Sequence, residues 1–267
     1  MPEQKGPVHL RGKSGGMVYS AGKYGDRASV APELTQKQKK EIASRPQNLR
    51  TGYLNNLGRG ILNAVKYHAG CLVPGPFFNN MLSLFREEKT NHRVLLLEKL
   101  RGMDVHRRYQ FGDACPIPKV ELKVGKTFYT IEVEFQAPAY HGDATCFYLD
   151  IILFTWNKDE DHCRHDVLST EWMNTGVQGV KYCTMKLKRK AEDTEFLLAC
   201  RCVKGVNHVE NGWTNTAMYF VGSGPLTEEG RKIVSERRAE EEAVRNAPPV
   251  KAAVREKKRV QVRDKKK

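Results

Sequence analysis

Apolar positions recur at helical spacing in the first half of the chain. Between residues 49 and 72 an apolar side chain returns every three or four positions, which predicts an amphipathic helix. Gly70 and the Pro74-Gly75-Pro76 turn end this helix, and Gly58 and Gly60 within it either weaken it or let another backbone approach closely. Further helices are predicted over residues 35–44, with Thr35 as N-cap, 76–85 and 90–100.

From Lys119 onward, apolar residues occupy every second position, which is the spacing of a strand with one buried face. Gly, Asn, Asp and Pro separate the apolar runs, and little helical signal lies between them. Repeated short strands of this kind predict an antiparallel immunoglobulin-like β-sandwich. The predicted strands are 120–124, 128–135, 145–154, 180–187, 195–206 and 217–221.

The two ends of the chain lack enough apolar surface for a core of their own. The Gly-rich, polar N-terminus predicts an extended arm that becomes ordered against something else. After Pro225, Thr227 caps a helix of almost entirely charged residues that ends before Pro248, and a Lys-rich tail follows. The predicted class is α+β, organised as a basic arm (1–33), a helical region (34–115), an immunoglobulin-like sandwich (116–224) and a charged helix with a basic tail (225–267).

Composition and charge narrow the class of partner. The chain has 267 residues, a formal net charge of +14 and 40% hydrophobic residues, so it is long enough to bury one or two cores. The charge is +10 over residues 1–115, −2 over 116–224 and +6 over 225–267. Basic flanks around a nearly neutral centre favour contact with a polyanion or an acidic protein, although a solvated helix face and a solubilising tail explain such runs as well.

The N-terminal residues show no secretory signal, and no apolar run approaches the roughly 20 residues that a membrane helix needs. The seven cysteines are odd in number and irregularly spaced, which favours reduced thiols. We therefore expect no membrane association and a cytoplasmic setting.

The candidate contacts to a polyanion or partner are basic side chains of the two flanks, with an Arg pair beside Tyr109. Interleaved tyrosines such as Tyr19 and Tyr24 add surfaces on which bases stack. The candidate contacts are Lys13, Lys23, Arg27, Arg107, Arg108, Lys257, Lys258, Arg259, Lys265, Lys266 and Lys267.

No catalytic motif is present, so the chain is not expected to be an enzyme and no cofactor is predicted. His162, Cys163 and His165 are the densest group of metal-ligand types, but their spacing matches no standard zinc pattern, and a polar loop accounts for them. Lys13 and Ser14 resemble the end of a phosphate-binding loop whose first glycine is missing. Cys200 and Cys202 share one face of a strand and are expected to face the core.

Several short motifs together resemble an uncharacterised family from Bacteroidota, in which a G-K-x-G segment and a helical region precede an immunoglobulin-like domain. The resemblance covers residues 10–224 and leaves out the C-terminal helix and tail. It implies a fold and a bacterial or phage source, and with that source a location in a virion or in the cytoplasm of a bacterial host. It implies no functional residue. The motifs are Gly12-Lys13-Ser14-Gly15, Val18-Tyr19, Gln47-Asn48, Gly52-Tyr53 and Met218-Tyr219-Phe220-Val221-Gly222-Ser223-Gly224.

Two functions follow as hypotheses. The first is a non-enzymatic structural component of a large assembly, a bacteriophage virion protein that docks on other subunits through its basic arms. The alternative is a protein that binds DNA or RNA through its basic flanks, with affinity that falls steeply as salt rises and is lost when residues 1–30 and 246–267 are deleted.

Overall fold

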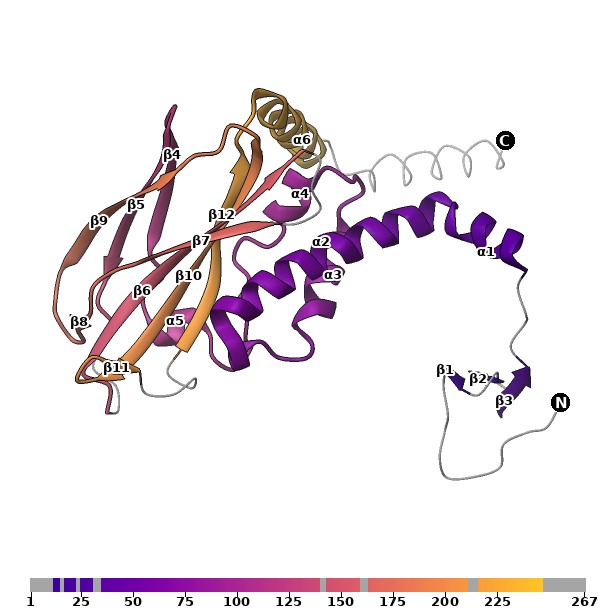
Figure 1. Ribbon diagram of the computed structural model, residues 1–267, viewed down its shortest axis with the longest axis horizontal. Helices are drawn as coiled ribbons and strands as arrows, with labels where there is room; N and C mark the ends of the chain where they lie inside the picture. The colour runs from indigo at the N-terminus through magenta and orange to yellow at the C-terminus, as the bar shows by residue number, and fades with distance from the viewer. Residues whose placement is uncertain are drawn as a thin grey trace, which may run out of the picture. The chain divides into compact units, whose positions relative to one another are not determined.

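The computed structural model describes residues 12–14, 17–22, 25–30, 35–139, 143–158, 163–210 and 216–246 (Figure 1). The chain divides into two compact units, residues 1–53 and residues 54–267, and the boundary falls inside a long helix. Helices and antiparallel sheets are both present, as an α+β chain requires.

The first unit contains short strands where the sequence predicts an extended arm. β1 (Gly12–Ser14), β2 (Met17–Gly22) and β3 (Gly25–Val30) pair in chain order as an antiparallel three-stranded sheet. Helix α1 (Gln36–Ala43) follows, and Thr35 caps it as predicted, because its hydroxyl accepts the Gln38 N–H while the Gln38 side chain accepts the Thr35 N–H. No residue of α1 is buried.

The long predicted helix is confirmed as α2 (Pro46–Ala69), which a short 3₁₀ turn, η1 (Gly70–Leu72), continues. Its apolar stripe begins later than predicted, because Leu49 is 60% exposed and the first buried residue is Leu54. The other helices are α3 (Phe77–Glu87), α4 (Arg93–Glu98), the unpredicted α5 (Phe111–Ala114) and α6 (Glu228–Asn246).

Two antiparallel sheets form the second unit. One has the order β4-β5-β9; in the other, β10 lies between β6 and β12, and β6 also pairs with β7. The six predicted strands are confirmed, and β7, β8 and β11 were not predicted. The strands are β4 (Lys119–Val124), β5 (Phe128–Gln136), β6 (Cys146–Asn157), β7 (Arg164–Ser169), β8 (Met173–Asn174), β9 (Val180–Lys188), β10 (Asp193–Val206), β11 (Val209–Glu210) and β12 (Thr216–Pro225).

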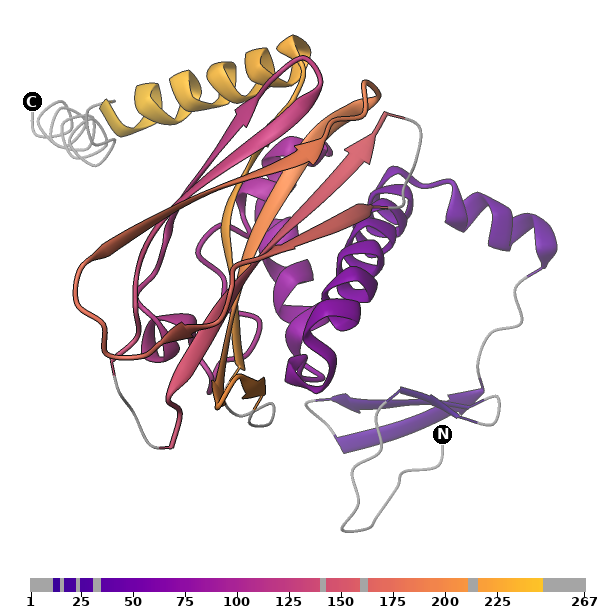
Figure 2. The ribbon, with the colours of Figure 1, turned by 60° about the vertical axis from the view of Figure 1, so that its left-hand side comes forward.

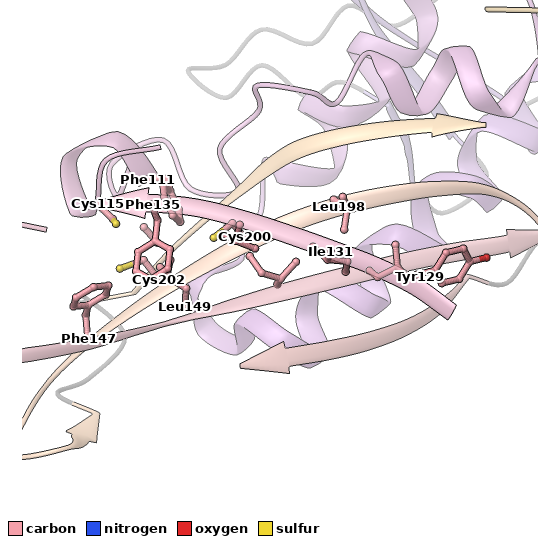
Figure 3. Close-up of a cluster of buried hydrophobic side chains, with 14 of the residues drawn as sticks. Phe111, Cys115, Tyr129, Ile131, Phe135, Phe147, Leu149, Leu198, Cys200 and Cys202 are labelled. Carbon is pink, nitrogen blue, oxygen red and sulfur yellow. The ribbon is translucent and has the colours of Figure 1, made fainter. Parts of the chain in front are cut away.

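The main core lies between these two sheets (Figure 3). Alternate residues of β5 meet alternate residues of β6 and β10, and Phe135 packs edge to face on Phe147 with ring centroids 6.4 Å apart. Cys200 and Cys202 both belong to this core, which confirms that they face inward from one side of β10.

The opposite face of the larger sheet is covered by helices, so the second unit has three layers (Figures 1 and 2). Phe77 of α3 stacks on Phe220 of β12, and Phe220 also contacts Phe154 of β6. α3 in turn lies against α2: a Cβ at Gly58 would stand 3.1 Å from side-chain atoms of both Leu82 and Phe78. Side chains of α3 therefore approach the α2 backbone closely at Gly58, whereas the sequence left open a weakened helix or the approach of another backbone.

Helix α6 completes the second unit. Val234 packs against Val94 and Leu95 of α4. This contact gives the narrow apolar stripe of the highly charged helix a packing surface. Arg237 lies 3.5 Å from the carboxylate of Glu88, whose side chain is 2% exposed. No helix among the described residues is both long enough and apolar enough to cross a membrane.

Candidate functional site

The exposed face of α2 carries a line of amide and basic side chains. Asn56, Arg59, Asn63 and Lys66 follow one another three or four residues apart, so they lie on one side of the helix, and all four are exposed. They extend over about 15 Å along the helix axis. We call these four residues the α2 polar stripe. Within the part of the chain that the structure describes, no hydrogen bond or ion pair occupies their side chains.

The charge of α2 has one sign. The helix contains Arg50, Arg59 and Lys66 and no Asp or Glu in 24 residues. Amides and cations together donate hydrogen bonds to phosphate oxygens, and Asn and Arg also bond the edges of bases. The stripe is therefore chemically suited to an anionic ligand that also presents polar acceptors.

The C-terminal end of α2 contacts the larger sheet through His68, and the apolar side of the helix is buried. Leu57, Ile61 and Val65 are at most 3% exposed, and they place the opposite, polar side of the helix in solvent. Arg201 of β10 donates a hydrogen bond to the carbonyl oxygen of His68 near the end of α2. The same guanidinium is held by Asp150 of β6, with Nε 2.7 Å from Oδ2. A rigid support of this kind keeps the stripe in one orientation.

Two histidines meet beside the C-terminal end of the stripe. His68 Nε2 lies 2.8 Å from His165 Nδ1, and the exposed ring of Tyr67 contacts both imidazoles. Burial lowers the pKa of His68 to about 4, and the nearby His165 and Arg201 act in the same direction. His68 is therefore neutral at physiological pH, and the positive charge of this surface comes from Arg59 and Lys66.

None of the predicted contact residues belongs to the α2 polar stripe. Arg107 and Arg108 are exposed on the loop before α5, and Arg107 Nη2 donates to Asn80 Oδ1 at 3.2 Å. Lys13 and Arg27 lie in β1 and β3, where the structure describes the backbone alone. Lys23, Lys257, Lys258, Arg259, Lys265, Lys266 and Lys267 lie outside the described residues.

Two of the three candidate metal ligands lie among the described residues, and they have different hydrogen-bond partners. His162 lies outside the described residues, Cys163 donates its thiol to the Gly60 carbonyl at 3.4 Å, and His165 faces His68 from β7. Residues 164–166 begin a strand, although a polar loop was expected to include them. Among the residues with described positions, no three potential ligands come together as a metal site would require.

Sequence reasoning missed the α2 polar stripe because it placed the polyanion contacts on the arms. A signal was present in the sequence, since a 24-residue amphipathic helix without a single acidic residue is unusual in a chain with 31 Asp and Glu.

Comparison with known proteins identifies no relative: no protein-family model, curated protein or solved structure matches this chain.

Proposed function

We propose that the protein is a non-enzymatic nucleic-acid-binding protein that contacts its ligand through the α2 polar stripe. The observation that carries the proposal is an exposed helix face of Asn56, Arg59, Asn63 and Lys66, with no acidic residue anywhere on the helix. Its cations neutralise phosphates, and its amides bond phosphate oxygens or base edges. The sequence predicted, as the alternative function, that the basic flanks bind DNA or RNA. The present proposal assigns this binding to one surface of the N-terminal flank, the α2 polar stripe.

Basic residues outside the stripe attract nucleic acid electrostatically, whatever its nucleotide sequence. Helix α1 of the first unit is exposed and carries Lys37, Lys39 and Lys40 against one acidic residue, Glu41. The C-terminal segment 247–267 is also rich in Lys and Arg. Both segments raise the rate and strength of encounter with a polyanion, while the stripe, on a fixed helix, determines how the ligand is oriented.

The test is fluorescence anisotropy with labelled single-stranded and double-stranded oligonucleotides at several salt concentrations. The variant Arg59→Glu/Lys66→Glu is expected to bind at least tenfold more weakly, and to reduce the slope of log affinity against log salt by about 2, one for each lost phosphate contact. Deleting residues 247–267 is expected to weaken binding further in an additive way.

The matched control is Lys186→Glu/Lys188→Glu, which makes the same charge change on exposed residues of β9. β9 belongs to the small sheet, on the other side of the larger sheet from α2. This control is expected to weaken binding only slightly, through net charge. Equal losses in the two double variants would show that attraction is diffuse and would overturn the assignment to α2.

A structural role in a large assembly, such as a bacteriophage virion, is a second candidate. It is favoured by the first unit, in which α1 buries no residue and Leu49 is 60% exposed. Segments that bury no side chain of their own become ordered against the surface of a partner. Sedimentation of the full chain tests the idea, because a monomer at every concentration whose first 30 residues resist protease would contradict docking through the arm.

We also infer that the sandwich is immunoglobulin-like. Among the long strands of the second unit, the first, second and fifth (β4, β5 and β9) form one sheet, and the third, sixth and seventh (β6, β10 and β12) form the other. This order supports the assignment, since the same strands share sheets in immunoglobulin domains. The fourth strand, β7, pairs with the third, whereas in constant-type domains it pairs with the fifth. An experimental structure that paired β4 with β6 would contradict it.

A further inference from the structure

A cavity of about 370 Å³ lies between α3 and the loop that precedes α5. Asn80 and Leu84 line it from α3, while Met103, Asp104, Val105 and Arg107 line it from the loop. This volume lies at the lower end of the range for small-ligand sites and suits a single ring system better than a larger molecule.

The loop wall of the cavity is held in place by the edge of the larger sheet. The Val105 N–H donates to the Met218 carbonyl at 2.9 Å, and the Phe220 N–H donates to the Met103 carbonyl at 3.1 Å. The segment around Asp104 therefore continues the sheet beside β12. Because backbone hydrogen bonds fix this wall, its side chains are held ready for a ligand.

Five polar side chains line the cavity, and the two charged ones, Asp104 and Arg107, have opposite sign; the uncharged ones are Asn80, Ser83 and Gln110. Asp104 Oδ1 accepts the Phe111 N–H at 2.8 Å, and Oδ2 has no donor among the residues that the structure describes. Arg107 donates one N–H to Asn80 Oδ1, and its guanidinium has further N–H groups that can donate to a ligand. Leu84, Met103 and Val105 supply apolar surface between these groups, against which a flat ring can pack.

From this arrangement we infer that the cavity binds an unpaired guanine base of single-stranded nucleic acid. Guanine presents two neighbouring N–H donors, N1–H and the N2 amine, which Oδ2 and the remaining lone pair of Oδ1 of Asp104 can accept together. Its O6 and N7 accept from an arginine. Adenine, cytosine and thymine lack this pairing of two adjacent donors with two acceptors. The inference rests on the proposed function, since the base would belong to the same ligand that the stripe holds.

The surroundings of the cavity fit a strand that continues beyond the bound base. Arg108 is exposed next to Arg107, in a position to meet a phosphate. The ring centroids of His106 and Tyr109 lie 4.7 Å apart on the same loop. Bases of a single strand can stack on aromatic rings of this kind. α3, which forms the other wall, lies directly against α2 through Gly58, so one helix separates the cavity from the stripe.

The experiment measures binding of the full-length protein to labelled thymidine 12-mers that carry dG, dA, dC or deoxyinosine at one central position. The dG oligonucleotide is expected to bind about tenfold more tightly than the others. Deoxyinosine, which lacks only the N2 amine, is expected to lose most of this preference. Asp104→Asn retains an oxygen for the Phe111 N–H and replaces the facing acceptor with a donor, so it is expected to abolish the preference for dG.

The matched control is Asp113→Asn, which removes the same charge from an exposed neighbour and is expected to leave the preference intact. The stripe variant Arg59→Glu/Lys66→Glu is expected to weaken all oligonucleotides equally and to keep their ranking. If the wild-type protein binds all four equally, the cavity assignment is wrong and the proposed function stands. If it binds none, both are wrong. Should Asp104→Asn fail to fold, the dG-to-deoxyinosine ratio of the wild-type protein decides the question.

Discussion

Arg201 and Asp150 face each other on neighbouring strands and form a largely buried ion pair, with Arg201 Nε 2.7 Å from Asp150 Oδ2. Ser169 donates to the other carboxylate oxygen at 2.6 Å, and the same arginine reaches the His68 carbonyl on α2. One guanidinium thus connects β10, β6 and the end of the helix that carries the stripe. The pair lies on the helix-covered face of the larger sheet.

Arg201→Met is expected to lower the free energy of unfolding by about 3 kcal/mol, because it leaves Asp150, 2% exposed, as an unpaired buried carboxylate. Urea denaturation measures the change. Arg231→Met, which removes an exposed arginine from α6, is the control and is expected to change stability by less than about 0.5 kcal/mol. Equal effects of the two substitutions would contradict the structural role of Arg201.

Gly58→Val is expected to cost about 1–3 kcal/mol, because the new side chain has no room beside Leu82 and Phe78 of α3. Gly52→Ala on the same helix meets nothing within 4 Å, and it is expected to stabilise the protein by up to about 1 kcal/mol through helix propensity. Thermal unfolding compares the two. A neutral Gly58→Val would mean that α2 and α3 do not approach each other this closely.

Acidification is expected to destabilise the protein through His68. Its pKa is about 4 in the folded chain and 6.5 as the reference value for an unfolded chain, so unfolding takes up a proton between these values. The contribution is complete above pH 6.5 and is lost as the pH falls from 6.5 to 4. Protonation would place a charge beside His165 and Arg201, with Asp150 offsetting part of the repulsion.

The measurement compares urea midpoints of wild type and His68→Gln from pH 8 to pH 4. The difference between the two proteins is expected to shrink or reverse as pH falls, because glutamine does not titrate. Parallel curves over this range would contradict a lowered pKa at His68.

The core cysteines are expected to resist alkylation in the folded protein. Cys115, Cys146, Cys200 and Cys202 are at most 1% exposed, and burial raises the pKa of the Cys200 thiol well above its ordinary value. Iodoacetamide at pH 8 with mass spectrometry of each peptide reports the rates. Labelling of these four is expected only after denaturation, and labelling of Cys200 at the unfolded rate would show that the sheets separate readily.

Local rules in the sequence determined much of the fold. Thr35 caps α1, apolar residues every three or four positions predict α2, and alternation predicts the strands of the sandwich, because each depends on residues close together in the chain. The inward direction of Cys200 and Cys202 followed from the period of a strand alone.

Tertiary structure decided what depends on distant partners. β7 is a strand because β6 supplies its hydrogen bonds, and its own sequence, Arg-His-Asp-Val-Leu-Ser, has no strong alternation. The pairing of Arg201 with Asp150 joins residues 51 positions apart, and the cavity joins α3 to a loop held by β12. The sequence placed excess positive charge on the flanks, and its apolar stripe indicated which side of α2 is buried. Tertiary structure decided that the amide and basic side of α2 stays exposed among the described residues, because this depends on where segments distant in the chain pack.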